Sequence, residues 1–484
     1  MNETAVNNEN YLYDRVVSRI TRLIDQGTLR PGDRVPSIRK LSSNDGVSVS
    51  TVLQAYLVLE SKGLIEAKPQ SGFYVRPRRN LPAEPRPSQP PPTVTRVGVS
   101  QLVSQIIGAA RNPQMINFGA ATPSPDLLPV KRLNRILAML AHRYDAVGIN
   151  YDFPPGYEPL RRQIAKRSLE WGCSLTPADL VTTNGAMEAI NLCIRAVAKP
   201  GDIIAIESPM FYGTLQVIES LGMKAVEIPM HPRDGIILEA VESAIKRYRI
   251  KACVISSNFS NPLGSCMPDK NKRELVELLS RREIPLIEDD IYGDLYFGPR
   301  RPKAAKAYDK AGLVLLCSSF SKTIAPGYRV GWAAPGQFRT RVESLKFMSS
   351  MGTATLPQMA ITEFLESGGY DRHLRRMKKS FADQMQLVTA GISQFFPKGT
   401  KVTRPQGGFL LWVELPQSVD SLKLHEMALR EKISIAPGPA FSAKQRYGNF
   451  IRLNCGQVKA DNVERALAAL GRLIAKLRWQ SDRN

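Results

Sequence analysis

The chain of 484 residues is expected to fold as an α/β protein whose larger domain is built on a mainly parallel sheet. In residues 101–484, short apolar runs alternate with stretches of helical periodicity, which is typical of strands that helices cover on both faces. The first 79 residues show helical periodicity followed by a short hairpin pattern, and residues 80–100 are rich in proline. We therefore expect three segments, at residues 1–79, 80–100 and 101–484.

The N-terminal segment begins with a helix expected over residues 11–26, because apolar side chains recur there at helical spacing. A short second helix is expected near Ser37. A third should begin after Ser48, a favoured N-cap residue, and end at Gly63. The stretches LIEAKP and GFYVRP then predict two short strands around a turn at residues 70–72. The side chains expected on the inward face of the third helix are Val52, Ala55, Tyr56 and Leu59.

This order of elements is that of a winged helix-turn-helix, and LRPGDRVPSIRKL with VSVSTVLQAYLVLESKGLIEAKPQSGFYV resembles the DNA-binding domain of the GntR family. The resemblance implies double-stranded operator DNA as a partner. Small polar side chains of the third helix would lie at base edges, and arginines and the wing at phosphates. The candidate DNA-binding residues are Arg34, Ser37, Arg39, Ser48, Ser50, Thr51, Gln54 and Gly72.

Val49 departs from the family pattern, in which an arginine often stands at this position of the third helix. A valine cannot form the bidentate hydrogen bonds by which arginine recognises guanine, so the operator sequence is left open. A winged helix used for protein contacts is the alternative interpretation of this segment.

Residues 80–100 combine many prolines with several arginines and few large apolar side chains. This composition predicts a semi-rigid linker of polyproline type, which would keep the two domains apart and be open to proteases. We expect no chemistry in this segment.

In the large domain, polar residues follow five apolar runs, DLVTTNG, DIIAIESP, ACVISSN, IPLIEDD and LVLLCSS. Because ligands of open parallel sheets lie beyond the carboxyl ends of the strands, we expect these polar residues to share one site. The last run leads into Ser319, Ser321 and Lys322, and Arg329 follows shortly after. A lysine made less basic by burial and nearby cations is a usable nucleophile, and hydroxyls with an arginine suit a phosphate ester. Pyridoxal 5′-phosphate requires this combination.

The stretch SFSKTIAPGYRVG resembles the lysine segment of fold-type-I, aspartate-aminotransferase-like proteins that use pyridoxal 5′-phosphate. The resemblance implies that Lys322 is the catalytic residue and holds the cofactor as an internal aldimine. In IPLIEDDIYG it assigns Asp289 to the pyridine nitrogen and Tyr292 to the phenolic oxygen, because the family spacing is Asp-x-x-Tyr. A surface lysine beside an arginine is the plainer alternative.

Other motifs follow in the order of that family. The residues that the resemblance assigns to the cofactor are Gly185, Ala186 and Met187 at the phosphate, Phe211 on the ring face and Asn261 at the phenolic oxygen. Tyr151, in YDFPPGYEPLRRQIA, is assigned to the phosphate of a partner subunit's cofactor, which implies a homodimer. Arg452, in FIRLNCG, is assigned to a substrate α-carboxylate, which arginine binds bidentately. Alone, these motifs have structural alternatives: a tight turn, a core aromatic, an Asn-Pro turn and a strand arginine in an ion pair.

The formal net charge of +22 favours acidic polymers or phosphorylated ligands as partners. The six cysteines and four histidines show no metal-binding spacing, so we expect no metal. No apolar run reaches membrane-spanning length and the N-terminus has no signal-peptide character. We therefore expect a cytoplasmic protein without membrane contact, associated with the nucleoid when it is bound to DNA.

A winged helix, a linker and an aminotransferase-like body together resemble the MocR-type branch of the GntR family of bacterial regulators. The resemblance implies a DNA-binding transcriptional regulator that senses pyridoxal 5′-phosphate or a small amino compound. The runner-up is an active aminotransferase with an attached DNA-binding domain, because each mapped catalytic position is chemically intact. A third interpretation is a degraded fold that serves only for dimerisation. The sequence leaves the effector and the direction of regulation open.

Overall fold

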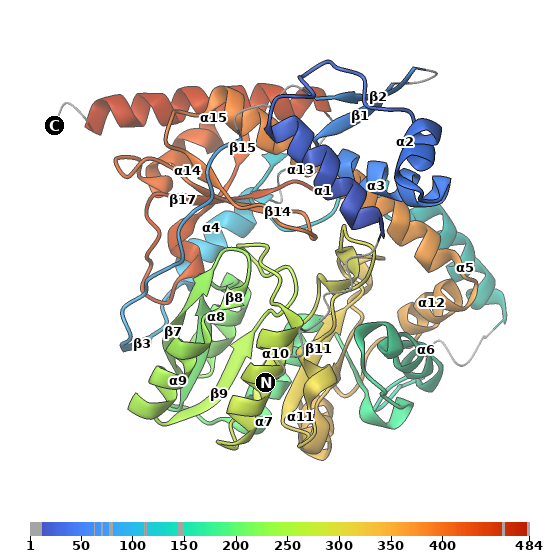
Figure 1. Ribbon diagram of the computed structural model, residues 1–484. Helices are drawn as coiled ribbons and strands as arrows, with labels where there is room; N and C mark the ends of the chain where they lie inside the picture. Colours follow the sequence, from blue (N-terminus) through green and yellow to red (C-terminus); the bar gives the residue numbers. More distant parts are fainter. Residues whose placement is uncertain are drawn as a thin grey trace, which may run out of the picture. The chain divides into compact units, whose positions relative to one another are not determined.

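Figure 1 shows the computed structural model, which describes residues 12–61, 63–68, 71–76, 81–110, 112, 114–143, 150–456 and 460–481. The chain divides into two compact units, Met1–Leu81 and Pro82–Asn484. The expected helix start at Tyr11 and the wing-turn residue Gln70 lie outside the described residues. Among the residues described, no helix combines the length and the apolar character that crossing a bilayer requires.

The N-terminal unit is the winged helix-turn-helix that the sequence predicts. Its elements are α1 (Leu12–Asp25), α2 (Ile38–Asp45), α3 (Val49–Ser61) and the antiparallel strands β1 (Ile65–Lys68) and β2 (Gly72–Val75). Ser37 caps α2, because its side chain accepts a hydrogen bond from the backbone amide of Lys40. The predicted inward residues of α3 are fully buried in one core with α1 and β1. This packing fixes which side chains α3 leaves exposed.

The large unit is built on a nine-stranded sheet in the order β3-β7-β6-β9-β10-β11-β12-β5, with β8 paired to β7. Its strands are β3 (Val94–Arg96), β5 (Val181–Thr183), β6 (Ile203–Ser208), β7 (Lys224–His231), β8 (Gly235–Ile236), β9 (Ile250–Ile255), β10 (Leu286–Asp289), β11 (Val314–Ser319) and β12 (Gly331–Ala334). Strands β7, β6, β9, β10 and β11 pair in parallel, whereas β3, β8 and β12 pair antiparallel to their neighbours. Since β5 is antiparallel to β12, it runs in the direction of β11. The prediction of a mainly parallel sheet is confirmed.

Helices α7 (Ala186–Val197), α8 (Tyr212–Ser220), α9 (Leu238–Arg247) and α10 (Asp269–Ser280) share one apolar core with this sheet. A second core lies between the sheet and α5 (Val130–Arg143), α6 (Glu158–Ser168), α12 (Thr355–Glu366) and the start of α13 (Gly369–Phe395). The remaining helices of the unit are α4 (Ser100–Ala110), α11 (Arg339–Ser350), α14 (Ser421–Arg430) and α15 (Ala460–Ser481). The carboxyl ends of the parallel strands therefore lie close to residues from distant parts of the chain, as the contact of Lys322 with Ala121 shows.

The C-terminal part of the large unit contains a four-stranded antiparallel sheet in the order β13-β14-β17-β16. These strands are β13 (Lys401–Val402), β14 (Leu410–Glu414), β16 (Ala436–Pro437) and β17 (Phe450–Asn454). A short parallel pair, β4 (Ile116–Asn117) with β15 (Ile433–Ser434), joins residues from the start of the unit to this part. Helices α13 and α15 lie side by side and share its core (Figure 1). This arrangement brings Arg452, on β17, next to the loop that follows β4.

The proline-rich segment is not a free spacer in the structure, because residues 82–99 pack onto the large unit. Strand β3 joins the edge of the large sheet through β7. The Ser88 hydroxyl donates to the backbone oxygen of Ser208 at 2.5 Å and accepts from the amide of Met230 at 2.8 Å. The Tyr248 hydroxyl donates to the backbone oxygen of Pro92 at 2.7 Å. The composition of the segment predicts its extended backbone but not these partners.

Candidate functional site

The candidate site lies where the parallel strands of the large sheet end. Asp289 is the last residue of β10, Ser319 is the last residue of β11, and Gly185 follows β5. Because these strands run in one direction, their carboxyl ends share one edge of the sheet. Arg452 enters from β17 of the second sheet. The structure therefore brings together most of the residues that the sequence assigns to a cofactor.

Lys322 lies partly buried just beyond β11, and its Nζ donates a hydrogen bond to the backbone oxygen of Ala121 at 2.6 Å. Burial lowers the pKa of Lys322 to about 8, with a further contribution from the positive charge of Arg452. The carboxylate of Asp289 opposes this change. With a pKa near 8, about a tenth of the amine is neutral at pH 7, far more than for an ordinary lysine, and this neutral form can act as a nucleophile.

Asp289 is almost fully buried, and this burial raises its pKa to about 7, helped by the neighbouring carboxylate of Asp290. Its Oδ1 accepts a hydrogen bond from the backbone amide of Ile291 at 3.2 Å. A cationic N–H group placed against Asp289 would lower its pKa and remove the cost of burying its charge. The protonated ring nitrogen of pyridoxal 5′-phosphate is such a group, so the residue fits its assigned role.

Arg452 is wholly buried, yet its guanidinium is not fully hydrogen bonded. One terminal nitrogen donates to Asn261 Oδ1 at 3.2 Å and the other to the backbone oxygen of Gly119. Its Nε has no hydrogen-bond partner among the described residues. A buried donor without a partner is costly, and a ligand carboxylate would satisfy both the donor and the charge. The side chain thus fits the role of a carboxylate receptor.

Tyr292 completes this side of the site. It is buried, and burial raises the pKa of its hydroxyl well above the usual value, although the charge of Arg452 opposes the shift. Its side chain is hydrogen bonded to Asn261. Two groups assigned to the phenolic oxygen of the cofactor therefore lie together, and both are neutral hydrogen-bonding groups at neutral pH.

An anion cradle lies at the N-terminus of α7. Gly185 occupies the N-cap position with φ of 90°, and no side chain caps the helix there, so Gly185, Ala186 and Met187 lie at its positive end. Arg329 donates to the backbone oxygen of Asn184 at 3.0 Å and to Ser321 Oγ at 3.5 Å. A Cβ added to Gly185 would lie 2.4 Å from Nη2 of Arg329. The backbone amides at the start of α7, the Ser321 hydroxyl and the Arg329 guanidinium thus lie close together, and these are the groups that bind a phosphate ester.

The structure connects three of the predicted cofactor residues less directly to the site, namely Ser319, Phe211 and Tyr151. Ser319 Oγ accepts a hydrogen bond from the amide of Ser321 at 3.3 Å, so it belongs to the lysine turn. Phe211 is half-buried at the N-cap of α8, with its ring centre 4.6 Å from that of Tyr212. Tyr151 is 72% exposed and stacks on Phe153. Its exposure places it on the surface of its own chain.

The candidate DNA-binding residues lie on the N-terminal unit. Ser37 and Ser48 are exposed at the starts of α2 and α3, and Ser50 and Gln54 are exposed on α3, whereas Thr51 is half-buried. Arg34 and Arg39 are exposed. The backbone at Gly72 has φ of 104°, and a Cβ there would approach Arg34 Nε to 3.2 Å. Glycine therefore lets the start of β2 lie against the Arg34 side chain.

Sequence reasoning missed the loop after β4. Ala121 supplies the acceptor for Lys322, and Gly119 supplies one for Arg452. Asn117 shapes this loop, because its Oδ1 accepts hydrogen bonds from the amides of Gly119 at 3.1 Å and Ala120 at 2.8 Å. The Asn-Phe-Gly sequence was the available signal, since asparagine two positions before glycine favours such a turn.

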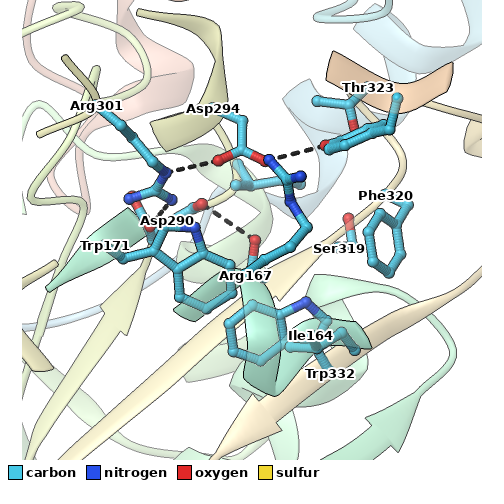
Figure 2. Close-up of a pocket in the computed structure, with 13 residues that line it drawn as sticks. Ile164, Arg167, Trp171, Asp290, Asp294, Arg301, Ser319, Phe320, Thr323 and Trp332 are labelled. Atoms are coloured by element: carbon cyan, nitrogen blue, oxygen red, sulfur yellow. Dashed lines mark hydrogen bonds and ion pairs between the residues drawn. The ribbon is translucent and has the colours of Figure 1, made fainter. Parts of the chain in front are cut away.

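A small buried pocket behind the site contains an ion-pair network (Figure 2). Arg301 donates to Asp290 at 2.5 Å and to Asp294 at 2.6 Å, and the Tyr370 hydroxyl donates to Asp294 at 2.9 Å. Burial favours the neutral acid, but the charges of Arg301 and Arg167 outweigh it, so the pKa of Asp294 is lowered. Asp290 is thus paired with Arg301, which leaves Asp289 as the carboxylate that fits the cofactor role.

Comparison with known proteins agrees with this division of the chain. Residues 114–470 match the family described as aminotransferase class I and II, and residues 12–75 match the bacterial regulatory proteins of the gntR family. The uncharacterized HTH-type transcriptional regulator YdcR of Escherichia coli (strain K12) is 38% identical over 96% of this chain and 98% of its own. The HTH-type transcriptional regulator NorG of Staphylococcus aureus (strain USA300) is 26% identical over 92% of this chain and 100% of its own.

Two solved structures resemble the large unit. The kynurenine aminotransferase of Pyrococcus horikoshii has a TM-score of 0.73 and 28% identity, covering 78% of this chain and 95% of its own. LysN, the α-aminoadipate aminotransferase of Thermus thermophilus, has a TM-score of 0.71 and 25% identity, covering 79% of this chain and 99% of its own. That structure contains N-(5′-phosphopyridoxyl)-L-leucine.

Proposed function

Because the chain belongs to the aminotransferase class I and II family and carries a GntR-family winged helix, we propose that it senses pyridoxal 5′-phosphate, or an amino compound held through it, to control transcription. It is an HTH-type transcriptional regulator of MocR type, as its full-length similarity to YdcR and NorG indicates. Class I and II aminotransferase domains typically depend on pyridoxal 5′-phosphate.

One observation carries the proposal. Burial lowers the pKa of Lys322 to about 8, and Lys322 lies close enough to Arg452 for the positive charge of the arginine to contribute to this lowering. Arg452 is itself buried, and its Nε has no hydrogen-bond partner among the described residues. A regulator that used this fold only as a scaffold would have no reason to keep a buried arginine without a full set of partners. A ligand with a carboxylate and a phosphate satisfies both parts of the site, because the carboxylate pairs with Arg452 and the phosphate fits the cradle at Gly185 and Arg329.

The cofactor, when bound, supplies an electrophilic carbon and an electron-withdrawing ring. The chain's own residues would orient it: the cradle at Gly185 and Arg329 holds the phosphate, Asp289 holds the proton of the ring nitrogen, and Asn261 with Tyr292 donates to the phenolic oxygen. Lys322 presents an amine that loses its proton more readily than an ordinary lysine. Arg452 takes the carboxylate of an amino compound.

Regulation follows if the ligand binds two arrangements of a homodimer with different affinity. Each subunit carries one winged helix, so a change in dimer geometry alters how two winged helices reach paired half-sites. Exposed Tyr151 supports the homodimer, since the aminotransferase family resemblance assigns that side chain to the partner subunit's cofactor. The partners are therefore operator DNA, a second copy of the chain and a small amino compound.

The second candidate function is aminotransferase turnover. The kynurenine and α-aminoadipate aminotransferases share the fold of the large unit, and Lys322, Asp289 and Arg452 stand together as transamination requires. Mixing the purified protein with single amino acids and following cofactor absorbance separates the two functions. Conversion to the amine form with release of a keto acid indicates an enzyme, whereas a stable spectral change without product indicates a sensor.

Mass spectrometry tests the cofactor assignment directly. The protein is incubated with pyridoxal 5′-phosphate, reduced with borohydride and digested, and we expect one pyridoxyl adduct, on Lys322. Lys322→Ala should lose the adduct, whereas the control Lys270→Ala, at an exposed lysine on α10, should keep it. Absence of any adduct from the wild-type chain would remove the sensing mechanism and leave only the DNA-binding function.

A further inference from the structure

Helix α3 presents an unusual surface for a helix that enters DNA. Its sequence, VSTVLQAYLVLES, contains no lysine or arginine. Its inward face is complete, because Val52, Ala55, Tyr56 and Leu59 are fully buried. Three further apolar side chains are nevertheless exposed, Val49 at 53%, Leu53 at 42% and Leu57 at 49%. Since they are four positions apart, they form a second, outward apolar stripe along the helix.

The hydroxyl groups at the start of α3 are already engaged with each other. Ser48 Oγ accepts a hydrogen bond from the amide of Thr51 at 3.1 Å, which caps the helix. The same oxygen lies 2.8 Å from Ser50 Oγ and 2.7 Å from Thr51 Oγ1. These hydroxyls therefore serve the helix end, and the exposed side chains that remain in the first turns are Val49, Leu53 and Gln54.

Basic residues surround α3 but lie on other elements. Arg39 and Lys40 are exposed on α2, Arg34 precedes it, and Lys68 and Arg76 lie on and beside the wing strands. This distribution matches a division of labour in which flanking elements contact phosphates and α3 alone contacts base edges. The apolar stripe would therefore contact the base edges in the major groove of DNA. The phosphates on either side of the groove carry the negative charge that complements the basic residues on the flanking elements.

The side chains available on α3 restrict which bases it can recognise. Guanine is recognised mainly by arginine or lysine, adenine by asparagine or glutamine, and thymine by apolar contact with its 5-methyl group. We propose that Val49 and Leu53 contact thymine methyl groups and that Gln54 contacts adenine, so that the centre of each half-site consists of A·T pairs. This inference rests on the proposed function, since it takes α3 to be the helix that enters the major groove.

Leu57 provides an internal control. It belongs to the same apolar stripe, but it lies eight positions after Val49, or about 12 Å farther along the helix axis. The residues of a recognition helix that contact bases lie in its N-terminal part. Leu57→Ala should therefore leave DNA recognition unchanged, whereas Val49→Ala and Leu53→Ala should not.

The experiment uses the full-length protein with pyridoxal 5′-phosphate and begins with selection of binding sites from duplexes of random sequence. Single thymines of the selected half-site are then replaced by deoxyuridine, which keeps every hydrogen bond and removes only the methyl group. We expect about a fourfold loss of affinity at each contacted thymine, the value for uncovering one methyl-sized group. Val49→Ala should abolish this dependence at one position, and Val49→Arg should shift the selected base at that position to guanine.

The outcomes separate the inference from the proposed function. A protein that selects a defined operator with G·C pairs at its centre, or that binds deoxyuridine duplexes as tightly as thymine duplexes, would overturn thymine recognition and leave the regulator intact. A protein that selects no DNA sequence at all would overturn both. Unchanged circular dichroism of the three alanine variants checks that these exposed substitutions leave the unit folded.

Discussion

Lys322 and Arg452 show how single side chains prepare the site before any ligand arrives. Burial lowers the pKa of Lys322, and the guanidinium of Arg452 lowers it further. Within the described residues, one nitrogen of the same guanidinium, Nε, has no hydrogen-bond partner, so in the proposed function the arginine both activates the amine and is available to bind an anion. When a carboxylate neutralises the charge of Arg452, Lys322 loses part of the repulsion that lowers its pKa. The two functions of the arginine are thus coupled through charge.

The pH dependence of cofactor binding tests this coupling. The pKa of Lys322 is lowered to about 8, so the neutral, reactive amine becomes dominant as the pH rises through this value. We expect the rate of pyridoxal 5′-phosphate incorporation, followed by absorbance, to fall about tenfold for each pH unit below the midpoint. Arg452→Met should move the midpoint upward, because it removes a positive charge, while Arg452→Lys should keep it near the wild-type value. A wild-type midpoint near 10.5, the ordinary value for lysine, would contradict the lowered pKa.

At the scale of the element, the sequence predicts what local rules determine. The strands that carry Asp289 and Ser319 are apolar runs that end in polar residues, and Ser37 and Ser48 mark helix starts by their capping chemistry. The role of the loop after β4 was not predicted, because the loop acts through backbone oxygens that accept hydrogen bonds from Lys322 and Arg452. The Asn117-Phe118-Gly119 sequence signals a turn, but it does not show that backbone oxygens of this turn accept hydrogen bonds from side chains of distant segments.

The start of α7 depends on one glycine, and two glycine substitutions test its role. We expect Gly185→Ala to weaken binding of pyridoxal 5′-phosphate about tenfold or more, because a hydrogen bond to a charged group contributes about 1.5–3 kcal/mol. The new Cβ would lie 2.4 Å from Arg329 Nη2 and displace the guanidinium from the cradle. The measurement is a cofactor titration by fluorescence.

Gly201→Ala is the matched control for this substitution. Gly201 has φ of 89°, close to the 90° of Gly185, but a Cβ there would meet no heavy atom within 4 Å. Both variants share the backbone strain, and only one crowds the arginine. Equal losses of cofactor affinity in the two variants would show that strain, not displacement of Arg329, is the cause.

At the scale of the whole molecule, the structure attaches the proline-rich segment to the large unit. The compact units are Met1–Leu81 and Pro82–Asn484, whereas the sequence predicts a separate linker over residues 80–100. Proline content correctly indicates an extended backbone, but the partners of Ser88 lie on β6 and β7, far along the chain. The amino-acid composition of a segment indicates how stiff its backbone is, but not which distant strands it packs against.

An exposed aromatic patch on the large unit provides a test of the homodimer. The patch consists of Tyr151, Phe153 and Phe347, all exposed, with the ring of Phe153 centred 5.5 Å from that of Tyr151 and 5.9 Å from that of Phe347. Exposed apolar side chains that gather from two elements are typical of interfaces. If the proposed homodimer forms through this patch, we expect Phe153→Asp to yield a monomer at micromolar concentration where the wild type is a dimer, as measured by analytical ultracentrifugation.

Leu169→Asp is the control, because Leu169 is also an exposed apolar residue but lies outside the patch. This variant should remain dimeric. A Phe153→Asp protein that sediments like the wild type would place the interface elsewhere, and with it the partner-directed role of Tyr151.

The attachment at Ser88 has a consequence for how ligand occupancy could be transmitted. Ser88 binds the backbone of Ser208, which lies three positions before the aromatic ring of Phe211, and the chain before Ser88 leads back to the winged helix. A ligand that displaces this ring would therefore act on a backbone segment to which the start of the large unit is hydrogen bonded.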